Sequence, residues 1–132
     1  MSLPNNIEDK GTIVLMYHRF EENKYPSTNI KKADFIKQID LIKKNGFSFI
    51  DANNFEDSLV NLKNKKKILL TIDDAFKSFY DQAWPILKKN KIPFLLFVNT
   101  REIGSSGYMT WSQIKEISKE KFVHIGNHSY SH

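Results

Sequence analysis

An apolar run that stops at two adjacent acids constrains the fold of this 132-residue chain more than any other feature. Residues 67–72 read Lys-Ile-Leu-Leu-Thr-Ile, and Asp73 and Asp74 follow directly. Such a run predicts a short buried strand, and the pattern over 75–90 predicts a helix after it. In α/β folds the carboxyl ends of strands carry the functional sites. The sequence therefore predicts a buried strand with two carboxylates at its functional end.

Strand-like and helix-like segments alternate along the rest of the chain. The expected strands are 12–18, 47–50, 67–74, 93–99 and 122–126, and the expected helices are 33–45, 55–62, 75–90 and 111–118. Gly46 is the expected left-handed cap of the first helix, and Asn54 and Thr110 are the expected N-caps of two others. Pro85 should kink or restart its helix. Alternation without a hairpin signal predicts a parallel sheet of the α/β class.

Length limits how much of such a fold the chain can build. A (β/α) barrel ordinarily needs roughly 200 residues or more, so we expect an incomplete (β/α) barrel with a mostly parallel sheet. Residues 11–132 would be the N-terminal part of that domain, and 1–10 a flexible segment or cloning scar. An unclosed sheet leaves an edge strand and an exposed apolar face, which predicts self-association, a swapped dimer or disordered ends.

Composition excludes several kinds of site. The chain has no cysteine, so disulfides and thiolate metal ligands are excluded and any ligand is nitrogen or oxygen. No stretch approaches the roughly 18 apolar residues of a membrane span, and a cell-envelope location would require an export signal upstream. The net charge of +5 comes mainly from lysines without aromatic interleaving, which argues against nucleic-acid binding.

Two histidines near the end of the sequence are candidate metal ligands. His128 and His132 stand four positions apart, and on one helical turn that spacing places both on one face. Imidazole and carboxylate suit zinc and its divalent neighbours, and three protein ligands leave a position open for water. The alternative for the histidines is a solvated surface pair. The alternative for the acids is that Asp73 caps the next helix and Asp74 is a first-turn acid.

These residues carry a resemblance to a known family. Residues 71–75, Thr-Ile-Asp-Asp-Ala, and 128–132, His-Ser-Tyr-Ser-His, resemble two signatures of the polysaccharide deacetylases, which remove acetyl groups from sugar polymers. Residues 15–20, Leu-Met-Tyr-His-Arg-Phe, resemble the first-strand signature of the subgroup acting on poly-N-acetylglucosamine. Further similarity lies in 85–89, 92–98 and 109–111. The resemblance covers about residues 11–132.

The resemblance implies a role for each matching residue. Asp74, His128 and His132 match the ligands of a divalent metal, which would be zinc or else nickel, cobalt, iron or manganese. Asp73 matches the general base that takes a proton from water, and His18 matches the acid that protonates the departing amine. The substrate implied is an N-acetylated glycan. The alternative for His18 is a histidine hydrogen-bonded to backbone at a strand end.

The sequence departs from the family pattern at three places. Ile72 stands where Phe is common, and Ala75 stands where Gly is common, so its methyl group would restrict a backbone that needs positive φ. The downstream Arg-Pro segment of the family is not present. A second hypothesis is therefore a truncated or degenerate domain that binds metal or glycan without catalysis. A third, a phospho-acceptor receiver domain, is disfavoured because two expected strands precede the acid pair.

Four aromatic residues have two interpretations. Trp111, Tyr108, Tyr17 and Phe20 could line a sugar groove, because aromatic faces pack on pyranose rings, or they could pack in the core or at its rim. We expect packing for Phe20 and Trp111.

Overall fold

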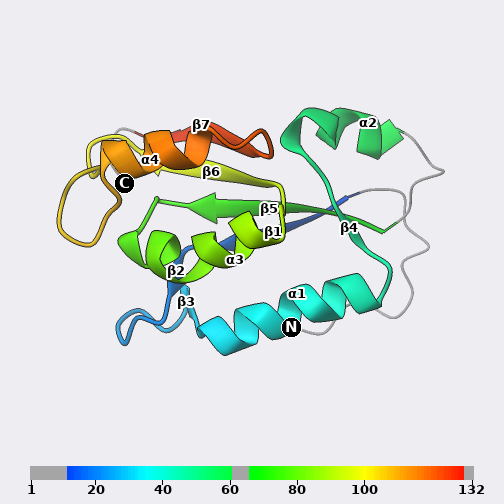
Figure 1. Cartoon of the computed structure of the whole chain (residues 1–132), viewed down its shortest axis with the longest axis horizontal. Helices are drawn as coiled ribbons and strands as arrows, with labels where there is room; N and C mark the ends of the chain where they lie inside the picture. The colour runs from blue at the N-terminus through cyan, green and yellow to red at the C-terminus, as the bar shows by residue number, and fades with distance from the viewer. Residues whose placement is uncertain (1–11, 61–65, 130–132) are drawn as a thin grey trace.

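The computed structural model of the chain describes residues 12–60 and 66–129, and the expectations for 1–10, 61–65 and His132 lie outside those ranges. Its main sheet is entirely parallel, with the strand order β1-β5-β6-β7 and β4 paired with β5 (Figure 1). These strands are β1 (Thr12–Tyr17), β4 (Ser48–Phe49), β5 (Lys67–Asp73), β6 (Phe94–Asn99) and β7 (Val123–Ser129). The predicted α/β class with a parallel sheet is confirmed.

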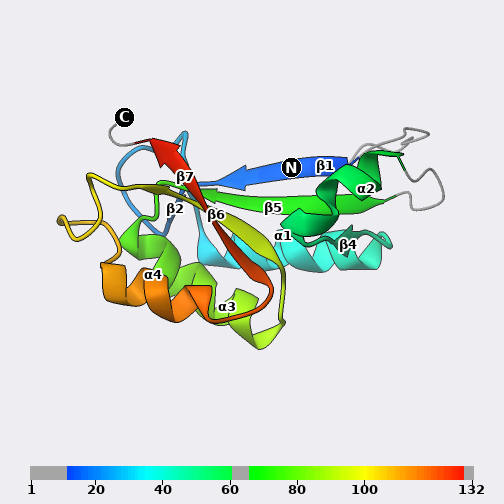
Figure 2. The same ribbon diagram turned by 90° about the horizontal axis from the view of Figure 1, so that it is seen from above.

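Three helices cover one face of this sheet, as Figure 2 shows. They are α1 (Lys32–Lys44), α3 (Trp84–Lys89) and α4 (Trp111–Ser118), while α2 (Phe55–Val60) lies at the end where β4 is. Alternate strand residues join the buried core, since successive side chains of a strand point to opposite faces. The core includes Leu15, Leu70, Ile72 and Leu96 from the strands and Phe35, Ile39, Phe79, Leu87 and Ile114 from the helices.

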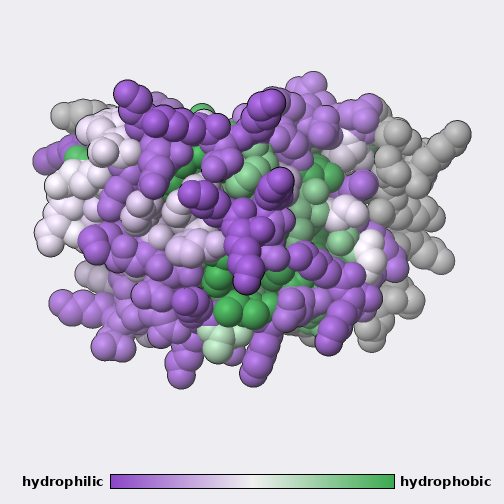
Figure 3. Space-filling model, in the orientation of Figure 1, coloured by the Kyte–Doolittle hydropathy of each residue, from purple (hydrophilic) through white to green (hydrophobic). Residues whose placement is uncertain are grey.

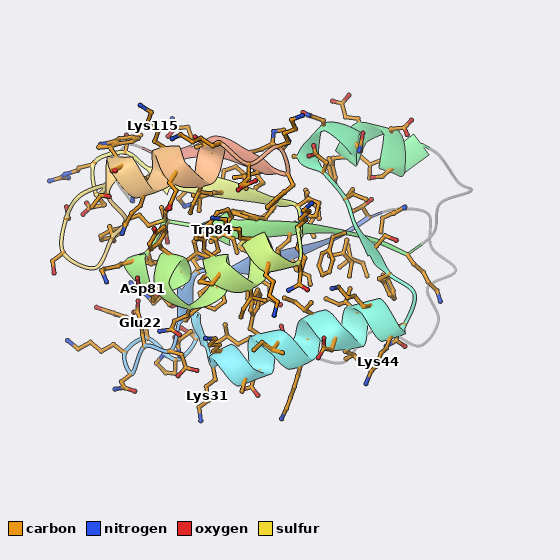
Figure 4. The ribbon with its side chains drawn as sticks, in the orientation of Figure 1. Glu22, Lys31, Lys44, Asp81, Trp84 and Lys115 are labelled. Atoms are coloured by element: carbon orange, nitrogen blue, oxygen red, sulfur yellow. The ribbon has the colours of Figure 1, made fainter. Side chains whose placement is uncertain are left out.

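The surface over the helices is mostly hydrophilic, with hydrophobic residues visible between the helices (Figure 3). Lys31, Lys44 and Lys115 point outward around its edge in Figure 4. On β1, by contrast, Val14 and Met16 are 47% and 60% exposed. Apolar side chains are therefore exposed on β1, at the edge of the sheet, whereas those of β5 are buried, and self-association through this edge remains a prediction.

Several local predictions are confirmed. Gly46 follows α1 with φ +77°, the left-handed conformation expected there. Thr110 caps α4 in a capping box, in which its hydroxyl accepts from Gln113 N–H and the Gln113 side chain accepts from Thr110 N–H. Pro85 lies in the first turn of α3, where the helix restarts after a π-helical segment, η2 (Phe79–Ala83).

Other local predictions are wrong. Asn54 does not cap α2, because a short 3₁₀ helix, η1 (Ala52–Asn54), precedes it and Asp51 accepts the capping hydrogen bond from Asn53 N–H. The last strand extends through Ser129, so His128 lies on a strand and not on a helical turn. A second, two-stranded parallel sheet of β2 (Arg19–Phe20) and β3 (Asn29–Ile30) was not expected. Strands of two residues are too short to show a period.

Tyr17 joins β1 to α1. Its ring packs edge-on against Phe35, with 5.1 Å between ring centroids, and its hydroxyl donates to Oε1 of Gln38. Burial raises the pKa of Tyr17 from 10.0 to about 12. Phe20, in the same aromatic cluster, is 1% exposed and confirms the packing interpretation, whereas Trp111 is 54% exposed at the start of α4.

The raised pKa of Tyr17 predicts a loss of stability in alkali. Folding favours the neutral phenol, so its contribution is complete below pH 10.0 and is lost as pH rises toward about 12. Denaturant unfolding of the wild type and Tyr17→Phe across this range should show the extra loss in the wild type alone. Parallel pH profiles would contradict this assignment.

Candidate metal and catalytic site

The predicted site residues gather at one edge of the main sheet. Asp73 is the last residue of β5, His18 directly follows β1, and His128 is the penultimate residue of β7. Since these strands are parallel, their carboxyl ends share that edge, and β5 has β1 on one side and β6 on the other. The fold thus brings together residues that are more than a hundred positions apart in the sequence.

Asp74 and His128 face each other across this edge. Oδ1 of Asp74 lies 3.5 Å from Nε2 of His128, and the side chains are 8% and 29% exposed. This separation exceeds the 2.7–3.2 Å typical of a direct N–H···O hydrogen bond. Two ligands on a tetrahedral zinc ion, each about 2.1 Å from it, are about 3.4 Å apart. The pair has the chemistry and the spacing of two ligands of one ion.

Asp73, at the end of β5, and His18, directly after β1, form a second pair. Oδ2 of Asp73 lies 3.6 Å from Nε2 of His18, with side chains that are 6% and 25% exposed. Hydrogen bonds between catalytic groups are often long in ligand-free structures and shorten when substrate binds. The candidate base and the candidate acid are therefore close to each other, and Asp73 is adjacent in sequence to Asp74 of the other pair.

A left-handed turn carries the chain from β5 to η2. Asp74 has φ +72° and Ala75 has φ +54°, and Ala75 is fully buried. An aspartate tolerates this conformation better than most residues, whereas an alanine is strained by about 1–2 kcal/mol. The loop before α4 holds the turn, because Met109 N–H donates to Ala75 O and Lys77 N–H donates to Gly107 O. Ala75, which stands where the family commonly has Gly, therefore occupies a position at which the backbone needs a positive φ.

An aromatic and cationic stack lies beside this turn and was missed by sequence reasoning. The Arg19 guanidinium lies 3.7 Å from the Phe76 ring centroid and 4.4 Å from that of Tyr25. It also forms a 2.8 Å ion pair with Glu22, a residue labelled in Figure 4. The Phe76 ring packs in turn on Tyr108, at 5.0 Å between centroids. The sequence did point to Arg19, because it lies in residues 15–20, the segment that resembles the first-strand signature of the family.

Tyr108 reports on the charge of the site. Burial raises the pKa of Tyr108 most, and the negative charges of Glu102 and Asp74 raise it further. The sequence left open whether this ring packs or lines a groove. It does pack on Phe76, and it also lies close enough to Asp74 to sense that carboxylate.

The third candidate metal ligand, His132, lies outside the described residues. Within residues 12–60 and 66–129, no group of three histidine, cysteine, aspartate or glutamate side chains is close enough to hold an ion. The described part of the site therefore consists of the Asp74–His128 pair. The complete set of three ligands remains a prediction.

Comparison with known proteins identifies the family. A model of the family described as polysaccharide deacetylase matches residues 61–132. The chain belongs to the polysaccharide deacetylase family. The match includes the acid pair and both candidate ligand histidines, so the resemblance seen in the two signatures is confirmed at the level of the family.

Two solved structures share the fold. IcaB from Ammonifex degensii superposes with a TM-score of 0.80 at 34% identity, over 91% of this chain and 53% of that one. The Streptococcus pyogenes deacetylase PplD, solved in complex with acetate, gives 0.74 at 28% identity, over 89% of this chain and 55% of that one. The described fold corresponds to about half of each of these two chains.

Curated relatives give the same picture. YxkH of Bacillus subtilis (strain 168) is 28% identical over 123 residues, which are 90% of this chain and 42% of that protein. The poly-beta-1,6-N-acetyl-D-glucosamine N-deacetylase of Staphylococcus aureus (strain MSSA476) is 22% identical, over 93% of this chain and 49% of that protein. The chain thus spans less than half the length of these two relatives. Within the described residues, no helix is long and apolar enough to cross a membrane.

The left-handed turn predicts different effects of two substitutions at Asp74. Asparagine, like aspartate, tolerates positive φ, whereas alanine does not. We expect the free energy of unfolding of Asp74→Ala to lie about 1 kcal/mol below that of Asp74→Asn, measured by denaturant titration in metal chelator. Both variants remove the negative charge, so the loss of that charge does not contribute to the difference between them. Equal stability of the two would show that the turn is not strained at this position.

Proposed function

We propose that this chain catalyses the metal-dependent removal of acetyl groups from an N-acetylated polysaccharide. The observation that carries the proposal is the pairing of Asp74 with His128 at 3.5 Å beside the pairing of Asp73 with His18 at 3.6 Å. Membership of the polysaccharide deacetylase family supports it. So does the name of the Staphylococcus aureus relative, which describes an N-deacetylase of poly-N-acetylglucosamine.

The candidate ligands define the kind of ion. In our proposal Asp74, His128 and His132 hold a divalent metal, for which zinc is the first candidate and nickel, cobalt, iron and manganese are alternatives. One oxygen and two nitrogen ligands leave a coordination position open. A bound ion of this kind lowers the pKa of water and polarises a carbonyl oxygen, which is the chemistry that amide hydrolysis needs near neutral pH.

The remaining residues move protons. Asp73, 6% exposed, takes a proton from the attacking water, and its burial among core residues keeps bulk water from competing for the carboxylate. Protonated His18 then gives a proton to the departing amine nitrogen, because an amide anion is too poor a leaving group to depart unassisted. Asp73 and His18 lie 3.6 Å apart. At this distance a proton gained by Asp73 changes the electrostatic environment of the His18 imidazole.

Space for a sugar lies next to His18. A shallow hollow of about 120 Å³ is lined by Met16, Tyr17, His18, Ser27, Thr28, Asn29 and Ile30. The hydroxyl and amide groups suit sugar hydroxyls, and Met16 offers apolar surface for a pyranose ring. The hollow opens beside the residue that we propose to protonate the leaving group, which supports a glycan amine as that group.

Substitution of the two acids should separate catalysis from metal binding. We expect Asp73→Asn to keep zinc affinity while acetate release from N-acetylglucosamine oligomers falls at least about 100-fold, the effect typical of losing a general base. Asp74→Asn should lose zinc affinity and activity together. Equal zinc affinity in the wild type and Asp74→Asn, measured by competition with a chromophoric chelator, would overturn the ligand assignment.

The proposed acid can be tested by changing the leaving group. His18→Gln should lower the hydrolysis of an N-acetyl sugar by about 100-fold or more, because the amine needs a proton. It should affect an aryl acetate far less, since a phenolate departs without protonation. Asp73→Asn serves as the control that slows both substrates. Equal losses on both substrates for His18→Gln would assign His18 to another task.

The hypothesis of binding without catalysis has its own outcome. The chain spans about half of each relative, and the purified 132 residues should either release acetate or only bind zinc or glycan. We expect acetate release that is abolished by a chelator and restored by zinc. Stoichiometric zinc binding with no acetate release would favour the binding hypothesis over ours.

A further inference from the structure

The His128 imidazole lies beside a support formed by two neighbouring strands. Phe97 of β6 is paired in register with Gly126 of β7, two residues before the histidine. The Phe97 and His128 rings are in contact, with centroids 6.3 Å apart and planes inclined at 51°. The phenyl ring thus packs against the imidazole from the neighbouring strand.

Gly126 makes room for that ring. A Cβ atom placed on Gly126 would lie only 2.9 Å from two atoms of the Phe97 ring, Cδ1 and Cε1, and 3.6 Å from Cδ1 of Leu95. The backbone of Gly126 is not left-handed, unlike that of Gly46, so its conformation does not demand a glycine. The requirement is steric: the absence of a side chain allows Phe97 to lie over β7.

The backbone at His128 is irregular, which increases the need for a side-chain contact. The register between β6 and β7 shifts after Val98, which pairs with Asn127, while Asn99 pairs with Ser129. His128 is the additional residue between those pairs. Such a bulge re-aims a side chain and interrupts the regular ladder. The ladder alone therefore does not fix the imidazole, and the Phe97 ring supplies a contact that limits its rotation.

We infer that Phe97, lying over Gly126, is a positioning residue that holds the His128 imidazole with Nε2 directed at Asp74. This inference rests on the proposed metal site, because it assigns a function to the orientation of one proposed ligand. Groups that orient a metal ligand from the next layer typically change metal affinity about 10- to 100-fold when removed. Phe97 acts by packing, so the lower end of that range applies.

The contact can be tested first without metal. The Phe97 ring current should shift the ring proton signals of His128 in the NMR spectrum of the metal-free protein, and Phe97→Leu should remove that shift. Leu95→Ala is the matched control, because Leu95 also borders Gly126 from the same strand. His128→Gln identifies the signals. Unchanged His128 signals in folded Phe97→Leu would overturn the inference.

Zinc affinity tests the consequence. We expect Phe97→Leu to weaken zinc binding about tenfold, while Leu95→Ala stays within about twofold of the wild type. Gly126→Ala should also weaken binding, because its methyl group displaces the phenyl ring. The double variant Gly126→Ala with Phe97→Leu should lose less than the product of the two single effects, since both act through one contact. Thermal unfolding checks that each variant folds, and Phe97→Leu carries the test if Gly126→Ala does not.

The outcomes separate this inference from the proposed function. Wild-type zinc affinity and acetate release together with unchanged affinity in Phe97→Leu would overturn the role of Phe97 and leave the metal site standing. A wild type that binds no zinc would overturn the metal site, and with it the positioning role. In that second case the NMR comparison would still show whether the two rings are in contact.

Discussion

Parallel pairing of β5 on both of its sides is the constraint on which the rest of the structure depends. β1 pairs along Lys67 to Ile72 on one side, while β4 and β6 pair with the two ends of the same strand. Its apolar side chains are almost completely buried, so their removal from water fixes the strand in the middle of the sheet. Because β5 cannot slide without exposing them, the acids at its end occupy a fixed place relative to His18 and His128.

Stability and the proposed chemistry conflict where β5 ends. Asp74 and Ala75 both have a left-handed backbone there, although neither is a glycine. The side chains of Asp73 and Asp74 are both buried. Strained backbone of this kind persists only where the surrounding structure holds it. Here it is held by two hydrogen bonds, from Met109 N–H to Ala75 O and from Lys77 N–H to Gly107 O. The turn directs Asp74 toward His128, so the local cost coincides with the position of a proposed ligand.

Much of the fold and part of the site followed from the sequence, for identifiable physical reasons. The burial of β5 and the N-cap at Thr110 depend on local patterns, and both were predicted. The capping role of Asp51 was missed because a 3₁₀ turn shifts the cap by three residues. His128 was placed on a helix, because the spacing of two histidines cannot reveal a strand that bulges against its neighbour. A contact between residues that are distant in the sequence, such as Phe97 and Gly126, cannot be recognised from the sequence around either residue.

The position of Arg19 links two loops that the sequence separates widely. Its guanidinium lies against Tyr25, in the segment between β2 and β3, and against Phe76, which pairs with Tyr108 in the segment before α4. A planar cation can contact two rings at once, which a lysine ammonium cannot do as well. The two segments are therefore mechanically joined: a force that moves one outward must also shift the other, or break the stack between them.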